Sequence, residues 1–185
     1  METPKNIARA IAGESMARNK YTFFASKAKK EGYEQIAAIF LETADNEKEH
    51  AKRLMKLLKK NTDSSLATFD FPIVKSTYDN LLEAANGENY EHTKMYPEFA
   101  RVAKKEGYKE ALDVFTEISE VEEEHEARYL KLAKNIKEGK VFTSNKKISW
   151  KCRNCGYIHK GKTAPKICPA CAHPQAHYEI LAKNY

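Results

Sequence analysis

A four-residue pattern, Glu-x-x-His, occurs twice in this chain and constrains its fold more than any other feature. Glu47 and His50 form the first copy, and Glu122 and His125 form the second, 75 residues later. Around each copy, apolar residues recur every three or four positions, which is the period of one face of an α-helix. Both pairs fall on that apolar face. A buried carboxylate is costly unless it is paired or bound to a metal, so the pattern predicts a metal site inside a bundle of helices.

The two copies belong to a longer internal repeat. Residues 13–60 match residues 87–135, and both halves contain the sequence Lys-Lys-Glu-Gly-Tyr. Gly32 and Gly107 interrupt the helical pattern, so each half is predicted to be a helix, a tight turn and a second helix. Two such hairpins make an all-α four-helix bundle. The linker between them, roughly 61–76, is long enough to cross the bundle lengthwise.

The composition of the chain changes at about residue 140. The preceding part is rich in Ala, Glu, Lys and Leu, whereas the part that follows contains all four cysteines and the single tryptophan. A chain of 185 residues has room for one good-sized domain and a small one. We therefore expect a helical domain over 1–139 and a four-cysteine domain over 140–185.

The repeat is offset by one residue at a single place. Tyr21 and Tyr96 lie 75 positions apart, but Glu14 and Glu88 lie only 74 apart, so one residue is inserted between Glu88 and Tyr96. Helices commonly absorb an extra residue as a π-bulge, and such bulges gather at functional sites. The inserted stretch includes Glu91, three residues after Glu88 and on the same face. The first half has no carboxylate at the corresponding position.

Glu14 and Glu88 also lie on apolar helix faces and complete the candidate site. One Glu from each of two helices and Glu-x-x-His from each of two others is the ligand pattern of di-iron and di-manganese sites in ferritin-like bundles. Carboxylates can bridge two metal ions about 3.5–4 Å apart, and imidazole nitrogen suits iron. A single Glu-x-x-His on a charged helix is commonly a surface coincidence. Two copies in register favour a two-metal site, because four carboxylates converging without metal would repel each other.

The four cysteines form a second candidate metal site. Cys152 and Cys155 make one Cys-x-x-Cys pair, and Cys168 and Cys171 make another. Two such pairs at this separation predict a tetrahedral thiolate site. Zinc and iron both accept four thiolates, and the spacing alone favours structural zinc. Because four thiolates complete the shell, the neighbouring histidines are expected to be surface residues: His159, His173 and His177.

Charge and hydropathy exclude several other classes of protein. The formal net charge is +6, but most lysines alternate with glutamates along helix faces, and no basic run with interleaved aromatics suggests a nucleic-acid partner. No long apolar segment predicts a membrane span, and the N-terminal residues lack the apolar core of a signal peptide. We therefore expect a cytoplasmic protein, in whose reducing compartment paired cysteines bind metal before they form disulfides.

Several stretches resemble rubrerythrin. They are Gly-Glu-Ser-Met-Ala-Arg-Asn-Lys-Tyr at 13–21, Ala-Ala-Ile-Phe-Leu-Glu-Thr-Ala at 37–44, Glu-Lys-Glu-His-Ala at 47–51, and the two cysteine knuckles, which resemble rubredoxin. The resemblance implies a ferritin-like bundle with a rubredoxin-like C-terminal domain. One departure is Ala172, where rubredoxins usually have glycine after the last cysteine. The resemblance also implies a di-iron centre that reduces hydrogen peroxide, with these ligands: Glu14, Glu47, His50, Glu88, Glu91, Glu122 and His125.

Glu91 has a role of its own in this interpretation. The other four glutamates contribute −4, which neutralises a diferrous pair, and Glu91 adds a fifth negative charge that favours diferric iron. The resemblance implies that one iron is held by His50 when reduced and by Glu91 when oxidised. It also implies that Tyr21 and Tyr96 hydrogen-bond ligand carboxylates and so orient them. His92 leans towards the helix flank and is not included in the site.

Together these features predict a peroxidase that takes part in oxidative-stress defence. Electrons are expected to enter at a thiolate-bound iron and to pass to the di-iron pair, although zinc could occupy the thiolates in recombinant protein. The chain contains no Gly-x-Gly-x-x-Gly, so a rubredoxin or an NAD(P)H-dependent reductase should supply the electrons. The resemblance implies a homodimer in which one subunit's thiolate iron serves the other's di-iron site. Two alternatives are a ferritin-like ferroxidase or iron store, and a zinc-ribbon interaction module fused to a bundle. The sequence leaves open whether oxygen or peroxide is the physiological oxidant.

Overall fold

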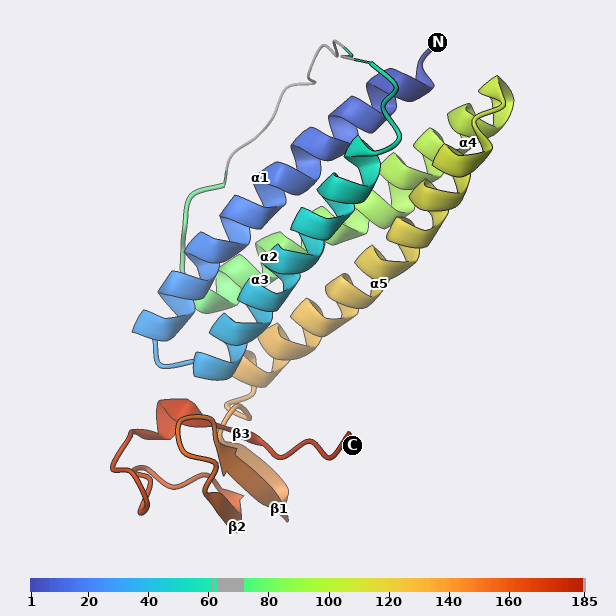
Figure 1. The fold of residues 1–185 in the computed structure, drawn as a ribbon. Helices are drawn as coiled ribbons and strands as arrows, with labels where there is room; N and C mark the ends of the chain where they lie inside the picture. The colour runs from blue at the N-terminus through green and yellow to red at the C-terminus, as the bar shows by residue number, and fades with distance from the viewer. Residues whose placement is uncertain (61, 63–71, 185) are drawn as a thin grey trace.

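The computed structural model describes residues 1–60, 62 and 72–184, and its larger part is a bundle of long helices lying side by side (Figure 1). No helix within these residues is long and apolar enough to cross a membrane. The helices follow the predicted repeat, with one hairpin from each half. Their bounds are α1 (Thr3–Lys30), α2 (Glu34–Met55), α3 (Thr77–Tyr90), the π-helical turn η1 (Glu91–Met95), α4 (Tyr96–Glu106) and α5 (Lys109–Lys137).

Glycines make the two hairpin turns, as predicted. Gly32 joins α1 to α2 with φ of +81°, and Gly107 joins α4 to α5 with φ of +78°. These are left-handed backbone conformations that glycine adopts without a steric penalty. The turns are equivalent positions of the repeat, so each half of the bundle is one antiparallel pair of helices.

The two hairpins are tied together by a reciprocal pair of helix caps. Oε2 of Glu31, just after α1, accepts a hydrogen bond from the backbone N–H of Thr77 at the start of α3 (2.8 Å). Glu106, at the equivalent position of the second repeat, accepts from the backbone N–H groups of Glu2 and Thr3 at the start of α1 (both 2.8 Å). A carboxylate is favourable there because helix N-termini carry unpaired N–H groups and a partial positive charge.

These caps also show how the hairpins are connected. The start of α3 lies beside the end of α1, whereas α2 ends beside the start of α1, where Leu54 packs near Ile7. The end of α2 and the start of α3 therefore lie at opposite ends of the bundle. The predicted linker over 61–76 lies largely outside the described residues, and only its two ends can be placed.

The third helical rod contains the predicted bulge. Five residues, Glu91–Met95, form a π-helical turn between α3 and α4. This turn lies within the stretch where the repeat offset placed an inserted residue, between Glu88 and Tyr96. The bulge prediction is confirmed, and the surrounding helices keep their apolar faces towards the core on both sides of it.

Two apolar clusters fill the bundle, one towards each end. Tyr21, Phe24 and Phe40 belong to the cluster nearer Gly32, and Ile7 and Phe115 belong to the cluster at the other end. These side chains are at most 1% exposed, and burying each large apolar side chain contributes roughly 1.5–3 kcal/mol. The predicted carboxylate and histidine ligands occupy the layer between the two clusters, which shields that layer from both ends of the bundle.

The remaining residues form a small β-domain at the Gly32 end of the bundle (Figure 1). Its elements are β1 (Thr143–Cys152), β2 (Ile158–Thr163), the 3₁₀ turn η2 (Gln175–His177) and β3 (Tyr178–Ile180), with antiparallel strand order β2-β1-β3. Trp150 is fully buried in it, and the indole N–H donates to the carbonyl of Gly161 (3.0 Å). Phe142 stacks on Tyr33 of the bundle with ring centroids 6.3 Å apart.

Candidate metal centres

The bundle brings six of the predicted ligands together in two overlapping groups. In each group one ligand atom per residue lies within 4.8 Å of all the others. Glu47 of α2 and Glu122 of α5 belong to both groups. The first group is Glu14, Glu47, His50 and Glu122, and the second is Glu47, Glu88, Glu122 and His125. Two sets of four ligands that share two carboxylates are what a two-metal site with bridging carboxylates requires.

The distances show how the shared carboxylates face both groups. Nδ1 of His50 lies 3.0 Å from Glu47 Oε2 and 3.0 Å from Glu122 Oε1. Nδ1 of His125 lies 3.4 Å from Glu47 Oε1 and 2.6 Å from Glu122 Oε2. Each shared carboxylate therefore offers one oxygen to each histidine. Glu14 Oε2 completes the first set at 3.6 Å from His50 Nδ1.

Burial of these groups provides a test of whether they fit metal ions. The side chains of Glu14, Glu47, Glu88 and Glu122 are at most 1% exposed. Within the described part of the chain, several buried atoms of these glutamates and of His125 have no partner in hydrogen-bonding geometry. They are Glu14 Oε2, Glu47 Oε1, both carboxylate oxygens of Glu122, and His125 Nδ1. Buried polar atoms are normally satisfied, and an unsatisfied carboxylate is costly. Metal ions would satisfy all of these atoms at once, so the residues fit a two-metal centre.

Two tyrosines orient the carboxylates that are not shared. The Tyr21 hydroxyl donates to Glu88 Oε1 (2.5 Å), and the Tyr96 hydroxyl donates to Glu14 Oε1. Each tyrosine thus serves the glutamate of the opposite repeat and leaves the second carboxylate oxygen free. Burial raises the pKa of both tyrosines well above the usual value, so both remain neutral donors. The hydrogen bonds predicted for this pair are present.

Burial disfavours charge on several carboxylates of the cluster. It raises the pKa of Glu14 to about 8, and the neighbouring His50 imidazole only partly opposes that effect. Burial also raises the pKa of Glu88 well above the usual value, and the charges of Glu47 and Glu122 add to the effect. Carboxylates in this state bind protons unless cations replace them.

For the two histidines and Glu47, the pKa shifts favour the charged form. Burial alone would lower the pKa of each histidine, but the neighbouring carboxylates raise it to about 12 for His50 and about 10 for His125. Burial would raise the pKa of Glu47, yet contacts with both imidazoles lower it to about 2. These shifts favour protonated imidazoles beside the carboxylates when no metal is bound. A metal ligand must give up its proton, so metal binding at this cluster releases protons.

Glu91 is the one predicted bundle ligand that belongs to neither group. It is the first residue of η1 and is half-buried. Its pKa is raised well above the usual value, by burial first and then by the charges of Glu14 and Glu88, and it begins η1 three residues after Glu88 of the second group. The structure therefore places Glu91 beside the site and His50 within it.

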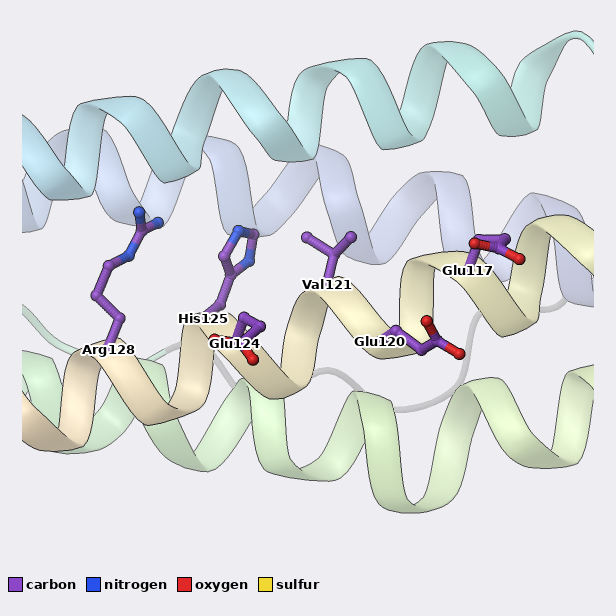
Figure 2. Close-up of a pocket in the computed structure, with 6 residues that line it drawn as sticks. All are labelled: Glu117, Glu120, Val121, Glu124, His125 and Arg128. Carbon is purple, nitrogen blue, oxygen red and sulfur yellow. The ribbon is translucent and has the colours of Figure 1, made fainter. Parts of the chain in front are cut away.

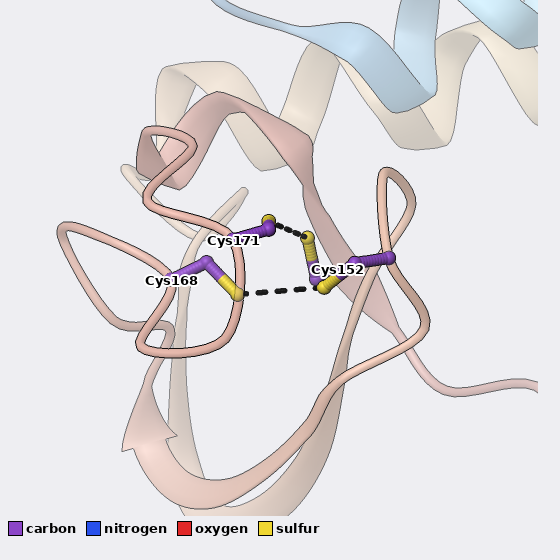
Figure 3. Close-up of side chains that lie close together, drawn as sticks. Cys152, Cys168 and Cys171 are labelled. Atoms are coloured by element: carbon purple, nitrogen blue, oxygen red, sulfur yellow. Dashed lines mark hydrogen bonds between the residues drawn. The ribbon is translucent and has the colours of Figure 1, made fainter.

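The four cysteines converge in the β-domain (Figure 3). Sγ of Cys152 lies 3.9 Å from Sγ of Cys171, and Sγ of Cys155 lies 3.7 Å from Sγ of Cys168. Metal–sulfur bonds of about 2.3 Å in a tetrahedron place sulfurs roughly 3.8 Å apart. The four thiols therefore fit a tetrahedral metal ion, and the geometry suits zinc and iron equally.

Among the described residues, the cysteine group includes no histidine. His173 is half-buried, and its Nδ1 contacts the carbonyl of Cys171 (3.0 Å), not a sulfur. Its ring meets that of His177 edge-on, with centroids 4.9 Å apart. Ala172, where the rubredoxin pattern has glycine, adopts the left-handed conformation with φ of +56°. The backbone at Ala172 therefore still forms a left-handed turn, although alanine replaces the glycine of the rubredoxin pattern.

A surface groove beside α5 reaches the metal layer. It encloses about 570 Å³ and is lined by Glu117, Glu120, Val121, Glu124, His125 and Arg128 (Figure 2). The Arg128 guanidinium donates to Glu42 Oε1 and Thr43 Oγ1 of α2, both at 2.6 Å. His125 lines the groove and also contacts the shared carboxylates. His125, which is 4% exposed, is therefore the residue that separates this groove from the cluster, an arrangement that the sequence pattern did not reveal.

Comparison with known proteins identifies relatives across the whole chain. The family model described as rubrerythrin matches residues 5–133, and the model for the rubrerythrin rubredoxin-like domain matches residues 150–179. A rubrerythrin of Nitratidesulfovibrio vulgaris is 53% identical over 183 residues, covering 99% of this chain and 96% of the relative. A rubrerythrin of Porphyromonas gingivalis is 54% identical over 184 residues, covering 100% of this chain and 92% of the relative.

The fold has solved counterparts as well. A structure of nigerythrin in its fully reduced, all-ferrous state aligns with a TM-score of 0.67 at 37% identity, covering 97% of this chain and 86% of that chain. The match includes both the helical bundle and the C-terminal β-domain. Both the ferritin-like fold and the rubredoxin-like domain expected from the sequence are confirmed.

Proposed function

Because this chain belongs to the rubrerythrin family of oxidoreductases, we propose that it is a peroxidase that reduces hydrogen peroxide to water. The supporting observation is the pair of ligand groups that share Glu47 and Glu122, combined with a separate four-cysteine site in the same chain. Storage of iron has no evident use for that second site. We divide the chain into a di-iron domain over 1–139 and an electron-relay domain over 140–185.

Iron is the metal that we assign to both sites. A related protein, nigerythrin, has been solved in an all-ferrous state, and carboxylate, imidazole and thiolate ligands all suit iron. The bundle pair would be held by Glu14, Glu47, His50, Glu88, Glu91, Glu122 and His125, and the single ion by Cys152, Cys155, Cys168 and Cys171. Two bound irons would supply the two electrons that, with two protons, convert one peroxide to two waters.

The protein's own residues have separate tasks in this reaction. Glu47 and Glu122 keep the two ligand groups together, since each has an oxygen facing each histidine. Tyr21 and Tyr96 hold the remaining two glutamates, so those carboxylates cannot rotate freely. The apolar clusters on both sides keep water from the bundle axis, and a small oxidant would approach from the groove beside His125. His50 and Glu91 would exchange as ligands between the reduced and oxidised states.

Electron supply favours an assembly of two subunits. Tyr33, where the β-domain touches the bundle, is 14 residues before Glu47 on the same helical rod, a separation of about 21 Å at 1.5 Å per residue. The cysteine site of a chain is therefore far from that chain's own di-iron site. A homodimer in which each β-domain lies near its partner's bundle would shorten the path. An external rubredoxin or an NAD(P)H-dependent reductase would reduce the cysteine-bound iron, in the cytoplasm.

An anaerobic stopped-flow experiment tests this function. The full-length protein is reduced, then mixed with peroxide or with oxygen at equal concentration, and reoxidation is followed by absorbance. We expect peroxide to react much faster. Faster reoxidation by oxygen would refute the peroxidase and favour the ferroxidase alternative. The Cys168→Ser variant should keep a single turnover of the pre-reduced bundle but lose steady turnover with a reductase.

A further inference from the structure

The π-helical turn η1 is held against α5 by polar contacts that the proposed function does not use. His92 Nε2 lies 2.6 Å from Glu126 Oε2. The side-chain amide of Asn89 donates to both oxygens of Glu126, at 3.2 and 3.1 Å. The hydroxyl of Ser119, also on α5, donates to the backbone carbonyl of His92 (3.2 Å). Asn89, before the turn, and His92, inside it, therefore both contact the carboxylate of Glu126.

These contacts are more than an ordinary surface pair. The side chains of His92 and Glu126 are only 15% and 19% exposed, so solvent screens this pair less than it screens an exposed surface pair. Glu126 receives contacts from two side chains that lie three residues apart. Such a carboxylate fixes both the position and the rotation of the segment that it contacts.

The place of this cluster in the fold connects it to the metal layer. Glu126 directly follows His125, and His92 directly follows Glu91. A π-turn contains one residue more than an α-helical turn needs, and a helical residue changes direction by roughly 100° per step. If the extra residue moved by one position, Glu91 would point away from the cluster. Something must hold the bulge in place, and Glu126 is situated to do so.

We propose that Glu126 is a positioning residue for Glu91, acting through His92 and Asn89. Glu126 itself touches neither the metal ions nor the substrate. Its hydrogen bonds set the register of η1, and that register sets where the Glu91 carboxylate stands when the centre is oxidised. The inference rests on the proposed function, because it takes Glu91 to be a ligand of the oxidised centre.

The test reads iron coordination in the oxidised full-length protein by ⁵⁷Fe Mössbauer spectroscopy, which separates bundle iron from thiolate-bound iron. We expect Glu126→Ala to change the signal of one bundle iron and to speed loss of that iron to a chelator by roughly tenfold or more. Glu126→Gln should retain the wild-type signal, because a neutral amide can still meet both partners. Glu123→Ala is the matched control, an exposed neighbour on α5, and should change nothing.

A second pair of variants tests whether Glu126 acts through Glu91. Adding Glu126→Ala to Glu91→Gln should leave the Mössbauer signal of Glu91→Gln unaltered. A further change in that background, or a wild-type signal in Glu126→Ala alone, would overturn the proposal. If Glu126→Ala does not fold, His92→Ala removes the other half of the contact and carries the same expectation. The peroxidase proposal fails separately, on reoxidation rates of the wild-type protein.

Discussion

Tyr96→Phe is the most direct test of how the bundle orients its ligands. The Tyr96 hydroxyl is buried and donates to Glu14 Oε1, while Oε2 of the same carboxylate faces His50. Phenylalanine keeps the ring and its packing but removes the donor. One buried carboxylate oxygen is then left without a partner, and Glu14 gains freedom to rotate.

The size of the effect follows from the kind of bond that is lost. A hydrogen bond to a charged group contributes about 1.5–3 kcal/mol. If about 2 kcal/mol of it is realised only when Glu14 is held as a ligand, metal affinity should fall roughly 30-fold, since about 1.4 kcal/mol is a factor of ten. That value lies within the range of about 10–100-fold found when groups that orient metal ligands are removed.

The assay is competition for ferrous iron between the anaerobic protein and a chelator of known affinity. Tyr21→Phe should behave in the same way, because Tyr21 holds Glu88 by the equivalent bond. Tyr90→Phe is the control, since Tyr90 is 59% exposed. If Tyr96→Phe bound iron as tightly as Tyr90→Phe, the orienting role of the hydroxyl would be refuted.

Three further predictions concern stability. Ala172→Gly should stabilise the β-domain by about 1 kcal/mol, because a non-glycine residue at φ of +56° is strained. The gain in stability is measured as the urea midpoint for loss of the thiolate–metal absorption, and an unchanged midpoint would contradict the strain. Backbone N–H groups of Glu2 and Thr3 lower the pKa of Glu106 to about 2, so its stabilising contribution is present above the ordinary value of 4.5 and is lost as pH falls towards 2. Wild type should therefore be more stable than Glu106→Gln at about pH 7, with the gap narrowing below about pH 4.5 and closing near pH 2; a gap independent of pH would show that charge is not responsible. Phe115→Ala should cost about 3–5 kcal/mol, because this side chain is fully buried; a guanidinium midpoint close to that of the wild type would argue against tight packing at this end of the bundle.

Much of the architecture could be predicted from the sequence because it depends on the periodic spacing of apolar residues and on the internal repeat. Apolar residues at helical spacing identify the core faces, and glycines at equivalent positions mark both hairpin turns. The change of repeat offset between Glu88 and Tyr96 is enough by itself to locate the π-turn. Six of the seven predicted bundle ligands meet in the structure. They meet because residues on the core-facing side of each helix, at the same level along the bundle, all point towards its axis.

What could not be predicted depends on contacts between different elements. Glu126 has the same sequence surroundings as its exposed neighbours on α5, and only the packing of η1 against that helix distinguishes it. The caps formed by Glu31 and Glu106 carried a signal, since both lie in the repeated Lys-Lys-Glu-Gly-Tyr. Their partners, however, depend on how the two hairpins are oriented. Alanine itself does not favour the left-handed conformation that Ala172 adopts, so only the glycine of the rubredoxin pattern pointed to a turn there.

The crosswise contacts have a consequence for how such a protein could originate. Each hairpin caps the other's first helix and hydrogen-bonds the other's glutamate. A single hairpin paired with an identical copy by a two-fold axis would make all of these contacts twice. Such a pair would also be symmetric, and any insertion would appear in both halves. Joining the hairpins in one polypeptide removes that restriction, so one half could acquire η1 and a fifth carboxylate while the other half kept its regular helix.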